Sequence, residues 1–241
     1  MAAADLWNRY VAWLAVHVPV AHANLAPGAS DERIGALEQT LQLSLPEAVK
    51  AVWRINDGQR ATMLANRIVK ATPCLPTLSL LSTEMVAAVW SEWDALRRDV
   101  PADQLAELHG GTRSVVKGVV KPLYTSARWV PLWADPTRAD YVGLDLDPDA
   151  GGAMGQIINF GRNEDDHHQY ATDFDDLLEF LVAEVEAGKW RASEMGYGDE
   201  TIPWFGEPRE HFFNALNERW QARNPRPPRK KAQGRAGVDV A

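Results

Sequence analysis

Alternating aspartates follow a short apolar run in the segment Tyr141-Val142-Gly143-Leu144-Asp145-Leu146-Asp147-Pro148-Asp149. Two carboxylates two residues apart at a strand end could supply a phosphoryl-transfer nucleophile, its acid/base partner and oxygen ligands for Mg²⁺. The same residues, followed by Ala150-Gly151-Gly152, are also typical of a turn that joins two strands. Their position past the middle of the chain, among runs expected to form antiparallel strands, favours the turn.

Metal binding is the next chemistry to consider. An EF-hand loop that starts at Asp145 needs Gly at its sixth position and Glu at its twelfth, where this chain has Ala150 and Gln156. His167-His168 follows three acidic residues, but adjacent strand residues point to opposite faces and cannot easily ligate one ion. We predict no metal ion and no other cofactor.

Sequence motifs of the common enzyme classes are missing. The sequence contains no Gly-x-x-x-x-Gly-Lys-Ser/Thr, Gly-x-Gly-x-x-Gly, His-Glu-x-x-His or Gly-x-Ser-x-Gly. Cys74 is the only cysteine, stands between Pro73 and Pro76, and has no adjacent basic residue to activate its thiol. We therefore predict a structural thiol, and the missing motifs leave few routes to a known enzyme class.

Negative charge is concentrated in one segment. The 241 residues carry a formal net charge of −8, and residues 135–186 contain fourteen Asp and Glu against two Arg. Such a body is not expected to bind nucleic acid or an anionic membrane, because phosphates need Lys and Arg. Residues 221–241 instead carry six Lys and Arg and one Asp. This basic end is a solvated tail, a contact to nucleic acid or membrane, or a segment that folds back onto the acidic body.

The acidic segment is either a contact surface for a protein partner or a set of acids that keep the domain soluble and cap turns. Trp129 and Trp133 lie four residues apart on a predicted strand, so they are expected on one face, in the core or as the wall of a groove. Phe180 is expected to be exposed among acids or covered by Trp190, Trp204 or Phe205. The candidate contact residues are Asp135, Asp140, Asp145, Asp147, Asp149, Glu164, Asp165, Asp166, Trp129, Trp133 and Phe180.

The elements that must position these residues change character near residue 115. Before it, apolar spacing and capping residues predict helices over 5–18 and from Ser30, Pro46 and Ser82 or Thr83, then a surface loop over 98–114. After it, short apolar runs predict mostly antiparallel strands at Val115–Leu123, Arg128–Trp133, Tyr141–Leu146 and Gly155–Phe160. Two further helices are predicted over 173–187, capped by Thr172, and near 208–222. Residues 62–69 and 77–81 are candidate strands.

These patterns predict an α+β fold with a mixed or mainly antiparallel sheet of four to six strands covered by helices. We expect an N-terminal helix (1–29) packed on a domain of residues 30–187, a C-terminal extension with a helix (188–222) and a disordered basic tail (223–241). No run of 18 apolar residues and no signal-peptide pattern is present. The expected compartment is the cytoplasm.

Five segments follow one another in a characteristic order. They are Leu37-Glu38…Leu45-Pro46-Glu47-Ala48-Val49-Lys50…Asn56-Asp57-Gly58, then Trp129-Val130-Pro131-Leu132, Tyr141–Pro148, Gly155-Gln156-Ile157-Ile158 and Thr172–Phe180. In this order they resemble the SMI1/KNR4 family (SUKH superfamily) over residues 30–187. Many members have two glycines where this chain has Gly58-Gln59, and Gly58 alone keeps the turn possible.

The resemblance implies a single α+β domain with no catalytic site and with a protein partner. Bacterial members include immunity proteins that neutralise toxins, and fungal members regulate cell-wall synthesis and act as scaffolds. An acidic segment would attract a basic toxin, so the first hypothesis is a non-catalytic binding module with an immunity role. The alternative is an intracellular scaffold or regulator. A metal-dependent hydrolase that uses Asp145 and Asp147 is a third, weaker hypothesis.

Overall fold

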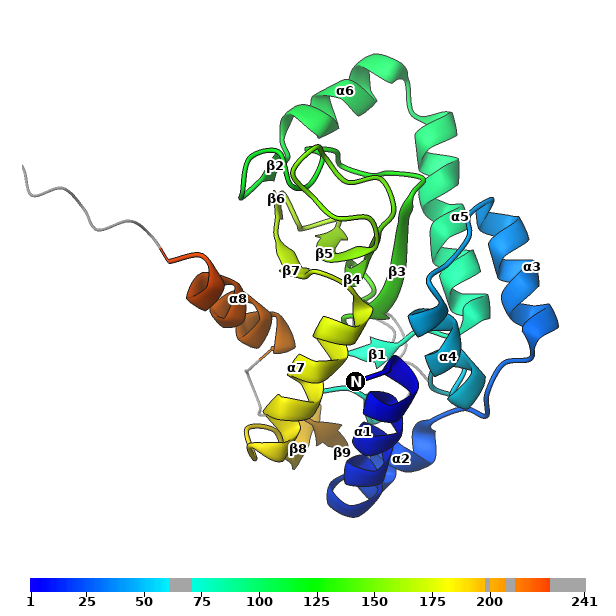
Figure 1. The fold of residues 1–241 in the computed structure, drawn as a ribbon, viewed down its shortest axis with the longest axis vertical. Coiled ribbons are helices and arrows are strands. Elements are labelled where there is room, and N and C mark those ends of the chain that lie inside the picture. The colour runs from blue at the N-terminus through cyan, green and yellow to red at the C-terminus, as the bar shows by residue number, and fades with distance from the viewer. Residues whose placement is uncertain (61–70, 198–199, 207–210, 226–241) are drawn as a thin grey trace, which may run out of the picture.

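The computed structural model describes residues 1–60, 71–197, 200–206 and 211–225. A five-stranded antiparallel sheet with the strand order β1-β3-β4-β5-β7 lies at its centre (Figure 1). A parallel pair (β2, β6) and an antiparallel hairpin (β8, β9) are separate from it. The strands are β1 (Ser79–Leu80), β2 (Arg113–Ser114), β3 (Trp129–Ala134), β4 (Asp140–Asp145), β5 (Gln156–Gly161), β6 (Asp166–His167), β7 (Gln169–Ala171), β8 (Ala192–Tyr197) and β9 (Glu200–Phe205).

Helices surround the sheet, which confirms the predicted α+β class. α5 packs on β3, α7 packs on β5, β7 and α1, and α8 lies beside β7 (Figure 1). The helices are α1 (Ala3–His17), α2 (Pro19–Asn24), α3 (Asp31–Leu41), α4 (Glu47–Ile55), α5 (Thr83–Asp99), α6 (Ala102–Gly110), α7 (Phe174–Glu186) and α8 (Phe212–Arg223). None of the described helices is long and apolar enough to cross a bilayer.

Capping residues explain several helix starts. The Ser30 hydroxyl accepts a hydrogen bond from the Arg33 N–H (3.4 Å), and the Ser82 hydroxyl accepts one from the Met85 N–H (3.2 Å). Both side chains satisfy backbone donors that a helix leaves free in its first turn. α7 differs from the prediction, because its N-cap is Asp173 rather than Thr172.

Two expectations for the middle of the chain are wrong. The segment predicted as a loop over 98–114 contains α6, which buries no residue and therefore shows no apolar stripe in the sequence. The predicted strand over 115–123 forms turns instead, because Gly118 adopts a φ of 81° and Pro122 lacks a backbone donor. The candidate strand over 62–69 and the helix start at Pro208 lie outside the described residues.

A β-bulge separates the two tryptophans of β3. Trp129 pairs with Asp145 and Trp133 pairs with Val142, so five residues of β3 match four of β4. Trp129 consequently contacts His167, whereas Trp133 contacts Phe212. The prediction that both rings share one face is wrong, because the bulge between Pro131 and Trp133 turns the second ring over.

The hydrophobic core includes Cys74, which is completely buried. Its N–H donates a hydrogen bond to Gln59 Oε1 (3.0 Å), and burial raises the pKa of its thiol to about 12. A thiol in this state is neither nucleophilic nor accessible. Cys74 therefore packs as a small apolar side chain.

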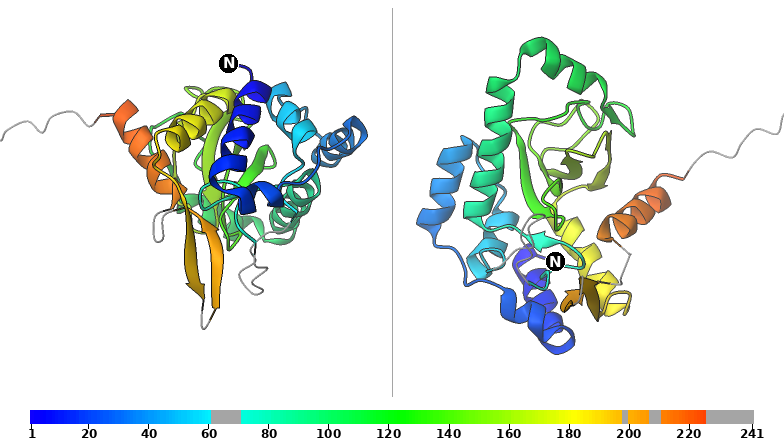
Figure 2. Two further views of the ribbon diagram at one scale, coloured as in Figure 1. Left: turned by 90° about the horizontal axis from the view of Figure 1, so that it is seen from below. Right: turned by 180° about the vertical axis from the view of Figure 1, so that it is seen from behind.

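The C-terminal part of the chain is attached to one side of this body. The β8–β9 hairpin projects away from it (Figure 2, orange), and no alternating pattern in the sequence predicts that hairpin. α8 continues to Arg223, which takes that residue out of the predicted tail. Residues 226–241 of that tail lie outside the described residues.

Candidate functional site

A buried hydrogen-bond network centred on Asp145 lies at the end of β4. The Asp145 side chain is fully buried and accepts hydrogen bonds from Trp129 Nε1 (3.1 Å), Gln156 Nε2 (2.8 Å) and the Asp147 N–H (3.0 Å). Burial raises the pKa of Asp145, and these three donors oppose that shift. Structural hydrogen bonds therefore occupy the Asp145 carboxylate, and its burial keeps it away from any substrate.

Gln156 extends the network into the surrounding loops. Its side-chain oxygen accepts from the Ala153 N–H (3.0 Å) and from Gln169 Nε2 (2.7 Å), and its amide also donates to the Val119 oxygen (3.1 Å). One buried amide thus joins the β4–β5 turn to β7 and to the loop before β3. Such fully satisfied networks fix a single conformation.

The turn Asn56-Asp57-Gly58 performs a similar task between helices. Asp57 accepts hydrogen bonds from the backbone N–H (2.7 Å) and the hydroxyl (3.1 Å) of Thr83 at the start of α5. Gly58 has a φ of 72°, and a Cβ there would lie 2.4 Å from the Ser82 nitrogen. Only glycine fits this approach, which explains the predicted turn in physical terms.

A surface groove of about 500 Å³ lies over the Asp145 network. One wall is the segment between α3 and α4, where the Leu45 N–H donates to Glu38 Oε1 (2.7 Å) and fixes the Leu45-Pro46 step. The other wall is the β4–β5 turn and the residue before β3. The lining residues are Gln42, Leu43, Ser44, Leu45, Pro46, Arg128, Leu146, Met154 and Gly155.

This groove is lined about equally by polar and apolar atoms, with Leu43, Leu146 and Met154 as apolar side chains and Arg128 as its one cation. Met154 is 69% exposed, so its side chain is accessible to a partner. The Arg128 guanidinium has no carboxylate within ion-pair distance in the described part of the chain. The groove can therefore accept an apolar side chain and a neighbouring carboxylate.

The walls of this groove fall within one family match. The model of the "SMI1 / KNR4 family (SUKH-1)" matches residues 28–179. The chain belongs to the SMI1/KNR4 family. Four of the five signature segments contribute residues to the Asp145 network or to the groove, and the fifth, Thr172–Phe180, lies at α7.

Curated relatives of this family are fungal proteins named as regulators. The chain is 24% identical to the cell wall assembly regulator SMI1 of Saccharomyces cerevisiae, over 76% of this chain and 40% of the relative. It is 27% identical to the cell wall biosynthesis/cell cycle regulator smi1 of Schizosaccharomyces pombe, over 86% and 40%. It is 22% identical to the glucan synthesis regulatory protein of Neurospora crassa, over 79% and 40%. The chain thus spans about two fifths of the length of these relatives.

Three of the predicted contact residues are inside the molecule. Trp129, Trp133 and Asp145 are at most 2% exposed. Trp129 packs against Phe160 and donates to Asp145, so its polar and apolar parts are both used in the core. The prediction that these residues form a contact surface is wrong, because the sequence does not reveal which end of a strand is covered.

Ion pairs with distant residues neutralise several of the predicted acidic contacts. Asp147 pairs with Lys121 (2.6 Å), and Asp166 pairs with Arg113 (2.6 Å). Asp135 closes a turn by accepting from the N–H groups of Ala139 (2.9 Å) and Asp140 (3.1 Å). The acidic segment is therefore much less negative as a surface than as a sequence.

A smaller acidic group remains near the end of β5. Asp140 accepts hydrogen bonds from the Asn163 N–H and side chain, both at 3.0 Å. Burial, and then the nearby Asp140, Asp166 and Asp135 carboxylates, raise the pKa of Glu164 to about 7. Asp165 is exposed beside it, whereas Asp149 lies in the β4–β5 turn. Asp135, Asp140, Glu164 and Asp165 are what the structure leaves of the predicted surface.

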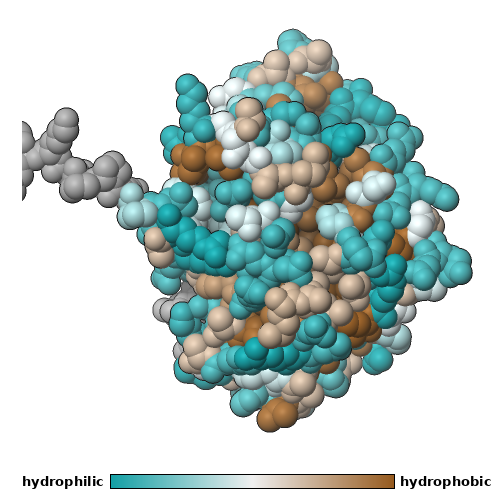
Figure 3. Space-filling view, in the orientation of Figure 1, coloured by the Kyte–Doolittle hydropathy of each residue, from teal (hydrophilic) through white to brown (hydrophobic). Residues whose placement is uncertain are grey.

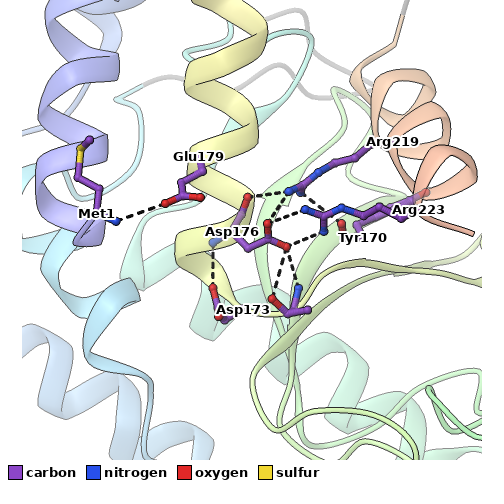
Figure 4. Close-up of polar contacts among 8 residues, drawn as sticks. Met1, Tyr170, Asp173, Asp176, Glu179, Arg219 and Arg223 are labelled. Carbon is purple, nitrogen blue, oxygen red and sulfur yellow. Dashed lines mark hydrogen bonds and ion pairs between the residues drawn. The ribbon is translucent and has the colours of Figure 1, made fainter.

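Phe180 is half-buried under α8 rather than under the aromatic residues proposed from the sequence. The Phe212 ring lies 5.9 Å from it, and the Arg219 guanidinium lies 4.6 Å above it. Asp176, one turn earlier on α7, pairs with Arg219 (2.5 Å) and Arg223 (2.8 Å) (Figure 4). These contacts fasten α8 to α7, and they join residues too far apart in the sequence for periodicity to reveal them.

Proposed function

We propose that this chain is a non-catalytic protein-binding module that acts as a regulator or scaffold in the cytoplasm. The observation that carries this proposal is the groove between the Leu45-Pro46 step and the β4–β5 turn. Both walls lie in the part of the chain that defines the family, and hydrogen bonds hold both walls in place. The names of the fungal relatives support regulation in preference to catalysis.

The partner that fits this groove is a segment with an apolar side chain next to a carboxylate. Leu43, Met154 and the buried Leu146 supply the apolar contacts, and Arg128 supplies the charge. Binding energy in such an interface is concentrated in a few anchors that exclude water. Hydrophobic residues form several separate groups on the face in Figure 3, so a local groove fits this protein better than one broad apolar surface.

A matched pair of variants tests the proposal. Partners captured from the source cells by the wild-type protein would be measured again with Met154→Glu and Arg128→Glu. We expect each groove variant to weaken binding about tenfold or more, because each places a carboxylate where the partner brings an apolar group or its own carboxylate. Val16→Glu, at an apolar side chain that is 75% exposed on α1, and Arg98→Glu on α5 are the controls and are expected to bind normally. Equal binding by groove variants and controls would contradict the proposal.

A toxin-neutralising role is the second candidate, and the acidic group at Asp140 and Asp165 is the observation that favours it. A basic toxin would be steered to these carboxylates over long range, and salt would suppress the association rate. The two roles differ in one measurement. A partner whose binding depends on Asp140→Asn and falls steeply with salt fits the immunity role, and a partner lost in Met154→Glu fits the regulator.

A further inference from the structure

We propose that the outer edge of β8 is a docking site for an extended segment of a partner protein, with a basic side chain beside Glu194. This site is separate from the groove, which is lined mainly by loops and turns, and it lies on a β-strand. The groove takes side chains, whereas a strand edge takes a polypeptide backbone.

Register shows which backbone groups of β8 point outward. Antiparallel strands exchange hydrogen bonds at every second residue pair. Pro203 faces Glu194 and has no N–H, and its carbonyl oxygen accepts from Thr72 Oγ1 (3.1 Å), outside the hairpin. The Gly206 N–H donates to the Arg191 oxygen (3.1 Å), so Arg191 and Gly206 form a hydrogen-bonded pair. Counting in steps of two from this pair, Ser193, Met195 and Tyr197 are the β8 residues whose backbone groups face β9. The N–H and C=O groups of Ala192, Glu194 and Gly196 therefore point away from β9.

These outward groups form an open edge. Within the described ranges, no hydrogen bond reaches the N–H or C=O of Ala192, Glu194 or Gly196, and all three residues are exposed. Natural sheet edges are usually protected by Pro, Lys, a bulge or a covering helix. In the described ranges β8 has no Pro, Lys, bulge or covering helix, and Glu194 is the one charged side chain on its edge. By contrast, Pro203 interrupts β9, and α8 lies beside the edge strand β7.

The hairpin also has the shape that strand addition requires. Ala192 and Gly196 have little or no side chain, so another backbone can approach the edge closely. On the other face, Met195 packs with Ile202 and Trp204, which gives the hairpin its own small apolar cluster. The hairpin projects from the body (Figure 2), and a third strand would stabilise a pair that is marginal alone.

The charge and length of the edge indicate what binds there. Glu194 is the only charged residue among the three outward positions, so a basic side chain opposite it is favoured. A second copy of the chain fits poorly, because antiparallel pairing centred on this residue brings two Glu194 side chains together. One edge of about 20 Å is also short for a stable dimer interface, which needs about 1,200 Å² or more. A strand from another protein meets neither objection.

A titration with a defined strand peptide tests this site. The full chain, labelled with ¹⁵N, would be titrated with Ac-Thr-Lys-Val-Lys-Val-Thr-NH2 and, separately, with the same peptide carrying Glu in place of Lys. We expect the basic peptide to shift the amide signals of Ala192, Glu194 and Gly196 and to slow their hydrogen exchange at least tenfold. The acidic peptide is expected to bind at least threefold more weakly.

Two proline variants provide the matched comparison. Glu194→Pro removes an outward donor from β8, and Thr201→Pro removes an outward donor from the opposite edge of the same hairpin. Each leaves the bonds between the strands intact, so both are expected to keep the hairpin signals. We expect Glu194→Pro to weaken peptide binding about tenfold and Thr201→Pro to leave it unchanged. Equal binding by both variants, or peptide shifts confined to other residues, would overturn the proposal, as would dimerisation through this edge in analytical ultracentrifugation.

Discussion

The five-stranded sheet and the β8–β9 hairpin differ in where their polar groups find hydrogen-bond partners. In the sheet, Asp145 and Gln156 direct their polar atoms inward to Trp129, Val119 and the β4–β5 turn. In the hairpin, every second residue of β8 leaves its backbone groups to solvent. The first arrangement produces a rigid support, and the second leaves hydrogen-bonding capacity for another molecule.

This difference separates residues that build the fold from residues that can recognise something. Aspartates that look reactive in the sequence are structural when a tryptophan and an amide already occupy their lone pairs. Backbone groups that no sequence motif marks are free because of register alone. The variants below test how far the two regions differ. The first three tests are in order of decreasing expected effect on stability, and the last is a dependence on pH.

The largest effect is expected at the centre of the buried network. Asp145→Ala leaves Trp129 Nε1 and Gln156 Nε2 without their acceptor, which should lower the free energy of unfolding by about 3 kcal/mol. Asp147→Ala removes only a half-exposed pair with Lys121 and is expected to cost less than about 1 kcal/mol. Urea unfolding measures both. Similar losses in the two variants would show that the network is not what supports the sheet.

Two glycine variants test the turn Asn56-Asp57-Gly58, which contacts the start of α5. Gly58→Ala forces a Cβ to within 2.4 Å of the Ser82 nitrogen at a φ of 72°, so we expect a loss of about 2 kcal/mol. Gly35→Ala, inside α3 with open space around it, should instead stabilise by up to about 1 kcal/mol. Thermal unfolding should therefore shift in opposite directions. Shifts of one sign would argue against a steric role for Gly58.

The attachment of the C-terminal extension is expected to be weaker. Asp176→Ala removes the acceptor of both Arg219 and Arg223 and should lower stability by about 1–2 kcal/mol. Glu179→Ala, on the exposed side of α7, is the control and should change little. Hydrogen exchange is the sharper readout, because α8 should exchange faster while β4 and β5 keep their protection. Equal loss of protection in α8 and β4 would mean that the two regions unfold together.

The last test is a pH dependence at Glu164, whose effect on stability appears only as pH rises above about 4.5. Its pKa is raised from 4.5 to about 7, so the folded protein holds a proton that the unfolded chain releases between these values. Stability from this group therefore falls as pH rises through that window. Glu164→Gln should unfold at higher urea than the wild type at pH 8 and at the same urea near pH 4. Asp165→Asn is the exposed control, and a gain at both pH values would point to a cause other than ionisation.

Local patterns were sufficient for much of the fold. The short apolar runs of β3, β4 and β5 and the hydroxyl caps at Ser30 and Ser82 depend on neighbours within a few residues, and the structure confirms them. α6 escaped detection because it buries no side chain. The bulge in β3 escaped because one extra residue reverses every side chain that follows it.

The predicted contact surface failed for a different physical reason. A count of charges along the chain treats each carboxylate as free. In the structure, several of these carboxylates form ion pairs: Asp166 with Arg113, Asp147 with Lys121, and Asp176 with Arg223. Those partners come from other parts of the sequence and are fixed only by folding. The open edge of β8 was equally hidden, since it depends on the register between two strands and on the proline opposite Glu194.

The burial of Cys74 makes this protein a convenient carrier for reporter groups. Its thiol is inaccessible and its pKa is about 12, so maleimides and iodoacetamides at neutral pH should leave it unmodified. Since it is the only cysteine, a cysteine introduced by Met154→Cys or Glu194→Cys would be the single reactive position. A fluorophore or spin label placed there would follow the groove or the strand edge separately, without first removing a native residue.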